Sequence, residues 1–411
     1  MTQHLFDFNY HNPTEIHFGQ GRIAQLSDLV PGQARVLLLY GGGSIKRNGV
    51  YEQVTQALGL RVCREVSGVE PNPSLETLLP AIEIVRTQQL DFILAVGGGS
   101  VIDAGKFLAV AAPADGEAWD FVAGRRPITT ALPVGVVLTL PATGSESNGT
   151  SVISRQASKE KKAFHSPKMR PRFAVLDPTV MRTLPDRQLA NGLVDAFVHA
   201  CEQYLTYPVG ALVQDGYAEA VLRALYRLAG SFERRREIGW CQNLMWAANQ
   251  ALSGLLGLGV PQDWATHAIG RELTALYDID HARTLSIVQP CLLRQTVLAK
   301  EEKLLQMGHA VFALADAGPQ PVIAEIEAMY RRLGMPLRLP EAGVVDEQAA
   351  ERIMAALAPQ QVQLRDIDEP ALRSILSALC RPAADTALLA CRPELVDTRP
   401  AQTPYFPGDP A

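Results

Sequence analysis

Four side chains of types that bind transition metals fall in one part of this sequence. Asp195 and His199 stand four residues apart, and His267 and His281 follow about seventy residues later. One carboxylate and three imidazoles suit a divalent metal ion, and an i, i+4 pair on a helix directs two ligands to one side. Taken alone, an Asp-x-x-x-His pair is more often a surface contact or a helix cap, so the preceding sequence must decide between the two interpretations.

The composition is that of a globular protein. The 411 residues are 47% apolar and 20% charged, enough for two domains with substantial cores. The net charge of -5 and the pI near 6.0 give no indication of a nucleic-acid surface. No run approaches the roughly twenty apolar residues of a membrane span, and the first residues lack a signal-peptide pattern. Six cysteines without C-x-x-C spacing suit a reducing compartment, so a cytoplasmic protein is expected.

The first half of the chain alternates strand-like with helix-like segments. Apolar runs typical of buried strands cover 34–40, 91–96, 134–140 and 173–176. Helical periodicity covers 73–88, where Pro73 would open the helix, and 101–112. This alternation predicts a mostly parallel sheet with helices on both faces.

The second half is rich in alanine and leucine and predicts helices throughout. The expected helical segments are 186–206, 209–230, 238–257, 262–277 and 284–316. The boundary is expected near Pro185, which gives an α/β domain over residues 1–185 and an all-α domain over 186–411. The tail after about residue 392 is rich in proline and polar residues and predicts an extended or frayed arm.

Three glycine-rich turns follow strands, at the expected carboxyl edge of the sheet. In Gly97-Gly98-Gly99-Ser100-Val101-Ile102-Asp103, the glycines let backbone N–H groups approach an anion, and the next helix points its positive N-terminus to the same place. A pyrophosphate fits this arrangement, and a tight turn that needs positive φ explains an isolated run of this kind equally well. The run is not the Rossmann G-x-G-x-x-G motif.

The other two turns also bear on a dinucleotide. The turn at 40–47, Tyr-Gly-Gly-Gly-Ser-Ile-Lys-Arg, has small residues, two cations and no carboxylate where an adenosine ribose would lie. It favours NADP(H) over NAD(H), and an ordinary basic surface loop is the alternative. The turn at 139–148, Thr-Leu-Pro-Ala-Thr-Gly-Ser-Glu-Ser-Asn, offers hydroxyls and a carboxylate for the nicotinamide ribose and the metal side, or a helix cap at Ser145.

In order and spacing, these turns and the four metal-binding side chains resemble the iron-containing (group III) alcohol dehydrogenases. The sequence looks most similar to the branch of NADPH-dependent aldehyde reductases and butanol dehydrogenases. Further matching runs are Glu70-Pro71-Asn72-Pro73, Ala163-Phe164-His165-Ser166, the six residues 194–199 and the nine residues 259–267. The resemblance covers roughly residues 5 to 335.

The resemblance implies a dehydroquinate-synthase-like fold with its active site in the cleft between the two domains, and a homodimer. It implies one divalent metal ion, iron or zinc, held by Asp195, His199, His267 and His281. By position, it places Gly97, Gly98, Gly99 and Ser100 at the pyrophosphate, Asp103, Thr139 and Thr143 near the nicotinamide, Lys161 near a ribose, and Gly42, Gly43 and Ser44 at the 2′-phosphate.

The implied reaction is hydride transfer between NADP(H) and a small aldehyde or primary alcohol, with aldehyde reduction as the expected direction. A metal ion with an open coordination position polarises a carbonyl as a Lewis acid, so catalysis needs no protein nucleophile. The cofactor carries the hydride, and the protein supplies positioning and electrostatics.

One residue departs from the family pattern. Many members carry a second histidine four residues after the third ligand, beside the substrate and the nicotinamide, and here that residue is Arg271. Arginine stays protonated, so it cannot relay a proton as imidazole does, but it can bind an anionic substrate group or a phosphate. Arg271 therefore predicts an altered substrate preference, toward aldehydes that bear a carboxylate or a phosphonate, and a slower rate.

Two other functions stay open at this point. Arg271 alone favours a member of the family with impaired catalysis and a binding role. A lyase of the dehydroquinate-synthase type has the same fold, but its relatives use a ligand set with a glutamate, which the Asp195 and His199 pair argues against.

Overall fold

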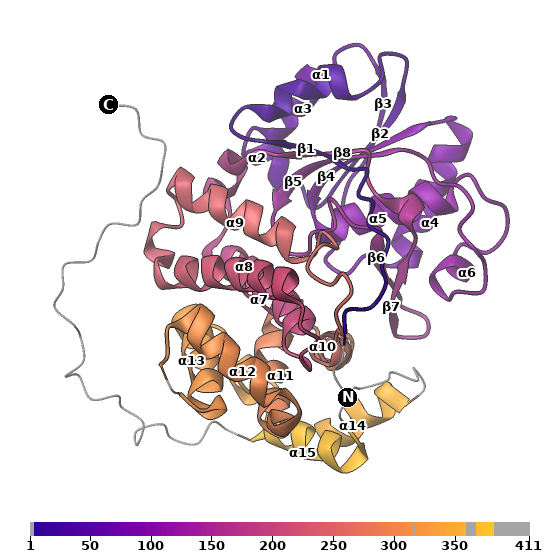
Figure 1. Cartoon of the computed structure of the whole chain (residues 1–411). Helices are drawn as coiled ribbons and strands as arrows, with labels where there is room; N and C mark the ends of the chain where they lie inside the picture. The colour runs from indigo at the N-terminus through magenta and orange to yellow at the C-terminus, as the bar shows by residue number, and fades with distance from the viewer. Residues whose placement is uncertain (1–3, 316, 359–366, 382–411) are drawn as a thin grey trace, which may run out of the picture.

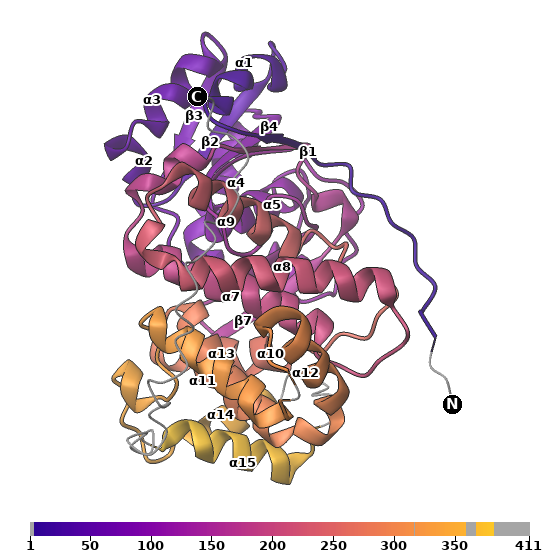
Figure 2. The same ribbon diagram turned by 60° about the vertical axis from the view of Figure 1, so that its left-hand side comes forward.

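The computed structural model describes residues 4–315, 317–358 and 367–381. The predicted tail after residue 392 lies outside the described residues. Figure 1 shows the two parts of the chain, a sheet flanked by helices that comes first in the sequence and a body of helices that follows it. Turned by 60°, the molecule shows the helical part packed along one end of the sheet (Figure 2).

Within the described residues, six parallel strands form the main sheet, in the order β1-β8-β5-β4-β2-β3. The bounds are β1 Glu15–Phe18, β2 Arg35–Tyr40, β3 Val62–Val66, β4 Phe92–Gly98, β5 Val134–Leu140 and β8 Phe173–Leu176. The predicted strands are β2, β4, β5 and β8, which are almost wholly buried. The sequence analysis missed β1 and β3, because these edge strands are half-exposed and carry no continuous apolar run.

The chain reverses direction across the sheet between β2 and β4. From β2 it moves outward to β3, and it then returns to place β4 on the other side of β2, with β5 beyond. All strands are parallel, so the loops after β2, β4 and β5 emerge side by side at one edge. In open α/β sheets such a switch point is where nucleotides bind.

Helices pack on both faces of the sheet, as predicted (Figure 1). They include α3 (Val50–Leu58), α4 (Leu75–Thr87) and α5 (Gly99–Ala111). Helix α4 begins after the Ser74 cap, one residue past the predicted opening at Pro73. Helix α5 packs between β4 and a hairpin of β6 (Thr150–Arg155) and β7 (Glu160–His165). The sequence analysis missed this hairpin, because polar residues interrupt its apolar positions.

The second half is helical in its described residues, as predicted. Its longer helices are α7 Asp186–Tyr204, α8 Leu212–Gly230, α9 Ile238–Ala251, α10 Ala265–Tyr277, α11 His281–Gln295, α12 Val297–Phe312, α13 Pro319–Arg332, α14 Ala349–Leu357 and α15 Glu369–Cys380. The predicted helical span 284–316 contains two helices, α11 and α12, separated at Thr296. No helix among the described residues is long and apolar enough to cross a membrane.

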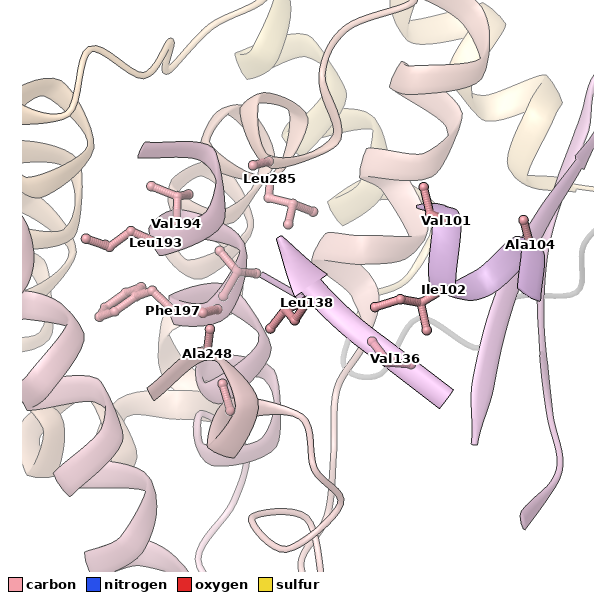
Figure 3. Packing of buried hydrophobic residues seen from close by; sticks show 14 of the residues in the cluster. Val101, Ile102, Ala104, Val136, Leu138, Leu193, Val194, Phe197, Ala248 and Leu285 are labelled. Atoms are coloured by element: carbon pink, nitrogen blue, oxygen red, sulfur yellow. The ribbon is translucent and has the colours of Figure 1, made fainter. Parts of the chain in front are cut away.

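One hydrophobic cluster runs through both parts of the chain. Figure 3 shows Leu138 of β5 and Ile102 of α5 in the same cluster as Phe197 of α7 and Leu285 of α11. Helix α7 begins at Asp186, but the division of the chain into domains 1–185 and 186–411 stays a prediction. The shared core holds α7 against the loop edge of the sheet.

A substitution at Gly192 of α7 tests how closely this helix must pack against the sheet. A Cβ at Gly192 would lie 2.3 Å from the backbone oxygen of Pro141, the residue that follows β5. We expect Gly192→Ala to lower the free energy of unfolding by about 1–3 kcal/mol in urea titrations, because two backbones must separate. Gly216→Ala on α8 is the control, since no heavy atom lies within 4 Å of its added Cβ. Equal stability of the two variants would contradict this packing.

Candidate metal centre and cofactor loops

Three helices bring the predicted metal-binding side chains together around one carboxylate oxygen. The Asp195 Oδ1 atom lies 3.6 Å from His199 Nδ1, 3.7 Å from His267 Nε2 and 3.9 Å from His281 Nε2. Asp195 and His199 share one face of α7, while His267 lies in the first turn of α10 and His281 is the first residue of α11. Residues from distant parts of the sequence therefore meet at one point.

The donor atoms of this group fit a divalent metal ion. One donor atom each from Asp195, His267 and His281 lies within 4.8 Å of the other two, and the His199 ring lies 4.4 Å from the His267 ring. Asp195 Oδ1, His199 Nδ1 and His267 Nε2 are buried and have no hydrogen-bond partner among the described residues. Buried polar atoms are normally paired, so their lone pairs are available to an ion with bonds of about 2 Å.

The electrostatics of the group favour a charged Asp195 carboxylate and neutral rings at His199 and His281. Burial opposes the charge of Asp195, but the surrounding histidines hold the pKa of its carboxyl well below the usual range. Burial lowers the pKa of His199 to about 4. Burial and the nearby Lys161 ammonium lower the pKa of His281 well below its usual value. Neutral imidazole is the form that coordinates a metal ion.

Glu202 positions the His267 ring through Nδ1, the nitrogen opposite to the one that approaches Asp195. Its Oε2 atom makes a very short hydrogen bond with His267 Nδ1, and its Oε1 atom accepts from the backbone N–H of His267. Burial acts against protonation of this ring, but the Glu202 and Asp195 carboxylates outweigh it and raise the pKa of His267 to about 9. When a metal ion displaces the proton from Nε2, the ring would keep Nδ1–H on Glu202 and direct its Nε2 lone pair to the side of Asp195. A carboxylate behind a coordinating histidine is a common way to orient it.

The sequence analysis missed Glu202, although a signal was present. Asp195, His199 and Glu202 stand at positions i, i+4 and i+7 of α7, which places them on one helix face. It also missed Asp280, which precedes His281. The Asp280 Oδ2 atom accepts hydrogen bonds from Arg187 Nε at 2.7 Å and Asn191 Nδ2 at 2.9 Å, and both donors belong to α7. Asp280 thereby ties the start of α11 to the helix that carries Asp195.

The glycines after β4 are required by close packing. An added Cβ would lie 2.5 Å from the Val101 side chain at Gly97, 3.1 Å from Leu140 at Gly98 and 2.7 Å from Thr143 Oγ1 at Gly99. None of the three has a positive φ, so the alternative of a strained turn is wrong. Helix α5 begins at Gly99, and its N-terminus lies at the carboxyl edge of the sheet. This is the geometry that binds phosphate groups.

The turn after β5 is fixed to α5 by a network around Lys106. The Lys106 ammonium is fully buried and donates to Ser145 Oγ at 2.8 Å, Asn148 Oδ1 at 3.1 Å and the backbone oxygen of Thr150 at 2.8 Å. Ser145 Oγ donates in turn to Asp103 Oδ1 at 2.6 Å. No helix begins at Ser145, so the alternative of a helix cap there is wrong.

Asp103 and the residues of the turn after β5 have structural partners. The Asp103 Oδ2 atom accepts from the backbone N–H of Val152, so both carboxylate oxygens are engaged. Thr139 is the penultimate residue of β5, and Thr143 Oγ1 accepts from the backbone N–H of Ser145. Glu146, expected on the metal side, is buried and accepts from Asn249 Nδ2 of α9. The two threonines are therefore the residues of this turn that remain beside the glycine loop.

The turn after β2 presents Gly42 and Ser44 on the surface and begins the short helix α2 (Ser44–Arg47). Lys46 is less available than the sequence indicates, because its Nζ lies 3.5 Å from Glu65 of β3 and 4.5 Å from the Tyr51 ring centroid. Glu65 is itself held by two tyrosine hydroxyls, Tyr40 at 2.7 Å and Tyr51 at 2.6 Å. The exposed Arg47 is the cation of this turn without a carboxylate partner among the described residues.

Lys161 links the cofactor side to the metal side. Its Nζ donates to Asn72 Oδ1 at 2.7 Å, and the backbone N–H of Asn72 donates to Ser100 Oγ at 3.4 Å. Burial, followed by the nearby Arg271 charge, lowers the pKa of Lys161 to about 8. Lys161 also interacts electrostatically with Asp195, so it stands between the start of α5 and the metal-binding group.

In metal-dependent dehydrogenases, a metal-binding group lies at the loop edge of a parallel sheet that has helices on both faces. Family models describe the chain over most of its length. The model for iron-containing alcohol dehydrogenases matches residues 13–178, and that for the C-terminal part of the Fe-containing alcohol dehydrogenase family matches residues 189–380. The chain belongs to the iron-containing alcohol dehydrogenase family. It is therefore a metal-dependent oxidoreductase that acts on alcohols and aldehydes.

Named relatives agree with this family. The chain is 48% identical to the NADPH-dependent aldehyde reductase YqhD of Escherichia coli over 82% of its length and 89% of the relative. It is 39% identical to the probable NADH-dependent butanol dehydrogenase 1 of Bacillus subtilis, over 85% and 94%. The crystal structure of E. coli YqhD superposes with a TM-score of 0.89 and covers 92% of this chain and 100% of that one. The fold and the predicted family are thus confirmed.

The buried Lys106 network gives a pH-dependent prediction. Burial lowers the pKa of Lys106 to about 8 in the folded protein, against 10.5 without burial. Above pH 8 the unfolded chain then binds more protons than the folded one, so the stability due to Lys106 rises with pH. We expect Lys106→Met to lower the free energy of unfolding by about 1–3 kcal/mol at pH 7, because three acceptors lose a donor. The loss should grow by roughly 2 kcal/mol toward pH 9.5.

Urea titrations at several pH values measure this difference directly. The exposed Lys159→Met is the control, and its difference from the wild type should stay flat over the same pH range. A Lys106→Met loss that shrinks with rising pH would show that the ammonium is charged well above pH 8.

Proposed function

We propose that this protein is an NADP(H)-dependent aldehyde reductase and primary-alcohol dehydrogenase with one divalent metal ion, Fe²⁺ or Zn²⁺. The main observation behind this proposal is that one nitrogen of each of three imidazoles lies 3.6–3.9 Å from the Asp195 Oδ1 atom. Asp195 Oδ1, His199 Nδ1 and His267 Nε2 have no hydrogen-bond partner among the described residues. Asp195, His199, His267 and His281 are the proposed ligands. The His281 side chain is 27% exposed, whereas the Asp195 and His199 side chains are 5% and 6% exposed, so the substrate approaches beside His281.

The proposed cofactor is NADPH for reduction. The names of the relatives include both NADPH and NADH, so our choice of NADPH is based on the residues of the turn after β2. Gly42, Gly43 and Ser44 leave room for a 2′-phosphate, and Glu65 of the neighbouring strand β3 is occupied by two tyrosines and Lys46. Gly97, Gly98, Gly99 and Ser100 would hold the pyrophosphate at the N-terminus of α5, with Asp103, Thr139, Thr143 and Lys161 toward the nicotinamide and its ribose.

The protein's own groups prepare the reaction by position and charge. When bound, the metal ion supplies Lewis acidity to the carbonyl oxygen. Glu202 keeps the proton of His267 on Nδ1 and so holds the ring in its coordinating orientation. The N-terminus of α5 would hold the pyrophosphate of the cofactor, whose nicotinamide would supply the hydride. Arg271 cannot release a proton at ordinary pH, so the proton for the product alkoxide comes from water or another relay.

Other parts of the proposal follow from the family. They are a homodimer, a cytoplasmic location, and a division of labour between a cofactor domain over residues 1–185 and a metal-binding domain over residues 186–411. The alternative of impaired catalysis with a binding role has only Arg271 in its favour, and we do not adopt it.

The test of the proposed function is NADPH oxidation on metal-defined protein. We expect wild-type protein loaded with Fe²⁺ or Zn²⁺ to oxidise NADPH with short-chain aldehydes, and chelated protein to lose this activity. Asp195→Asn should lower the metal content measured by mass spectrometry below about one tenth of wild type and reduce kcat by at least roughly a thousandfold, because the central charged ligand is gone.

His309→Ala is the matched control, since His309 is an exposed histidine on α12. It should keep full metal content and turnover. A metal-loaded wild type that turns over no aldehyde in a broad panel would overturn the proposed function.

A single charge tests the assignment of the 2′-phosphate site. Gly42 has no positive φ and no heavy atom within 4 Å of an added Cβ, so Gly42→Asp introduces a carboxylate without a clash. We expect it to lower kcat/KM for NADPH about tenfold or more, through repulsion of the phosphate, and to leave NADH equally good or better. Gly42→Asn has the same shape without the charge and should keep the NADPH preference. Equal effects of both variants would place the 2′-phosphate elsewhere.

A further inference from the structure

Arg271 stands beside the metal-binding group on the same helix as His267. It lies four residues after His267 in α10, which places its Cα about 6 Å farther along the helix axis. Helix α10 also packs against β7, the strand that carries Lys161. The charge of Arg271 is the second-largest cause, after burial, of the lowered Lys161 pKa. Two cationic side chains therefore approach each other next to the metal-binding group.

The guanidinium of Arg271 is largely buried and lacks a close partner. It makes no hydrogen bond or ion pair with any residue that the structure describes. Burial lowers the pKa of Arg271, and the Glu202 and Glu272 carboxylates raise it only in part. Each Glu202 oxygen already accepts a hydrogen bond from His267, and none from Arg271. A buried charge without a hydrogen-bonded partner is costly. The five N–H donors of the guanidinium are therefore available to bind an anion that the chain itself does not provide.

Three observations place that anion on the substrate. Arg271 is one helical turn from the proposed ligand His267, so an anion on its guanidinium lies a few carbon atoms from a carbonyl at the metal. The His281 side chain is 27% exposed, so a molecule from solvent can reach the metal-binding group on this side. The phosphates of the proposed cofactor already have the N-terminus of α5 and the turn after β2.

We propose that the substrate is an aldehyde with a carboxylate two or three carbons from the carbonyl, and that Arg271 binds the carboxylate through two parallel N–H donors. This inference rests on the proposed function. A planar guanidinium matches the two oxygens of a carboxylate, and charge-assisted pairs of this kind are strong where water is excluded. Lys161 adds positive potential beside the pair. Arg271 is thus a specificity-determining residue.

The test compares two aldehydes that differ by one charge, 4-oxobutanoate and its methyl ester, with NADPH and metal-loaded protein. We expect the wild type to prefer 4-oxobutanoate in kcat/KM by at least about tenfold. Arg271→Gln should lower that preference by roughly 10- to 100-fold, mainly through KM, and Arg271→Lys should fall between, because an ammonium keeps the charge but not the fork. Lys162→Gln is the control, since Lys162 lies on β7 and pairs with Glu160. It should keep the wild-type preference.

A binding measurement independent of turnover accompanies the kinetics. Calorimetric titration with succinate, a dicarboxylate without a carbonyl, should give a Kd at least about tenfold weaker for Arg271→Gln than for the wild type and for Lys162→Gln. The Kd of the wild type should also rise with ionic strength.

Each outcome separates this inference from the proposed function. Equal kcat/KM of the wild type for the two aldehydes, or an unchanged succinate Kd in Arg271→Gln, overturns the inference and leaves the aldehyde reductase standing. A higher KM for NADPH in Arg271→Gln with both aldehydes equally affected assigns Arg271 to the cofactor and overturns it as well. A wild type that reduces neither of these two but does reduce other aldehydes overturns the inference alone, and one that reduces no aldehyde of the broad panel overturns both.

Discussion

A buried carboxylate that needs a cation is the constraint on which the rest of this structure depends. Asp195 is 3% exposed, and no hydrogen bond from a described residue reaches its Oδ1. A desolvated charge of this kind is tolerated only with a strong partner. The Asp195 Oδ1 atom accepts no hydrogen bond within the described part of the chain and the rings of His199 and His281 are neutral, so a metal ion is the partner that this donor set fits. Helices α7, α10 and α11 must then hold their relative positions, which they do through Glu202 and Asp280.

Close packing of backbone segments determines the structure at the loop edge of the sheet. Gly97, Gly98 and Gly99 let α5 start directly at the strand, where its N-terminus faces the switch point between β2 and β4. Lys106 then fixes the neighbouring turn by three hydrogen bonds and leaves it little freedom to move. The proposed phosphate site is built from backbone, and the proposed metal site is built from buried side chains. Hydride transfer requires this fixed spacing, because donor and acceptor must meet at near contact distance.

The sequence predicted those features that leave a continuous or periodic signal. Central strands appear as apolar runs, helices show their period, and the four metal-binding side chains stand in a family-specific order. The edge strands β1 and β3 and the β6-β7 hairpin leave no such run, because one side of each is polar or exposed. The partners of the site residues were missed for another reason. Asp280 and Lys106 act through contacts across 39 to 93 residues of sequence, and Glu65 acts between neighbouring strands, so only the fold brings these partners together.

The balance of charge near the metal-binding group is the reason why we propose that Arg271 binds an anion. Asp195 is a proposed metal ligand and Glu202 accepts from His267, and neither carboxylate forms an ion pair with the Arg271 guanidinium. Replacing a titratable imidazole by a permanent cation therefore adds positive charge to a site that already contains Lys161 and would receive a divalent ion. A neutral aldehyde would leave that charge buried and uncompensated, whereas a carboxylate on the substrate would neutralise it on binding. In the role proposed for it, Arg271 recognises an anion at the position where many members of the family carry a histidine.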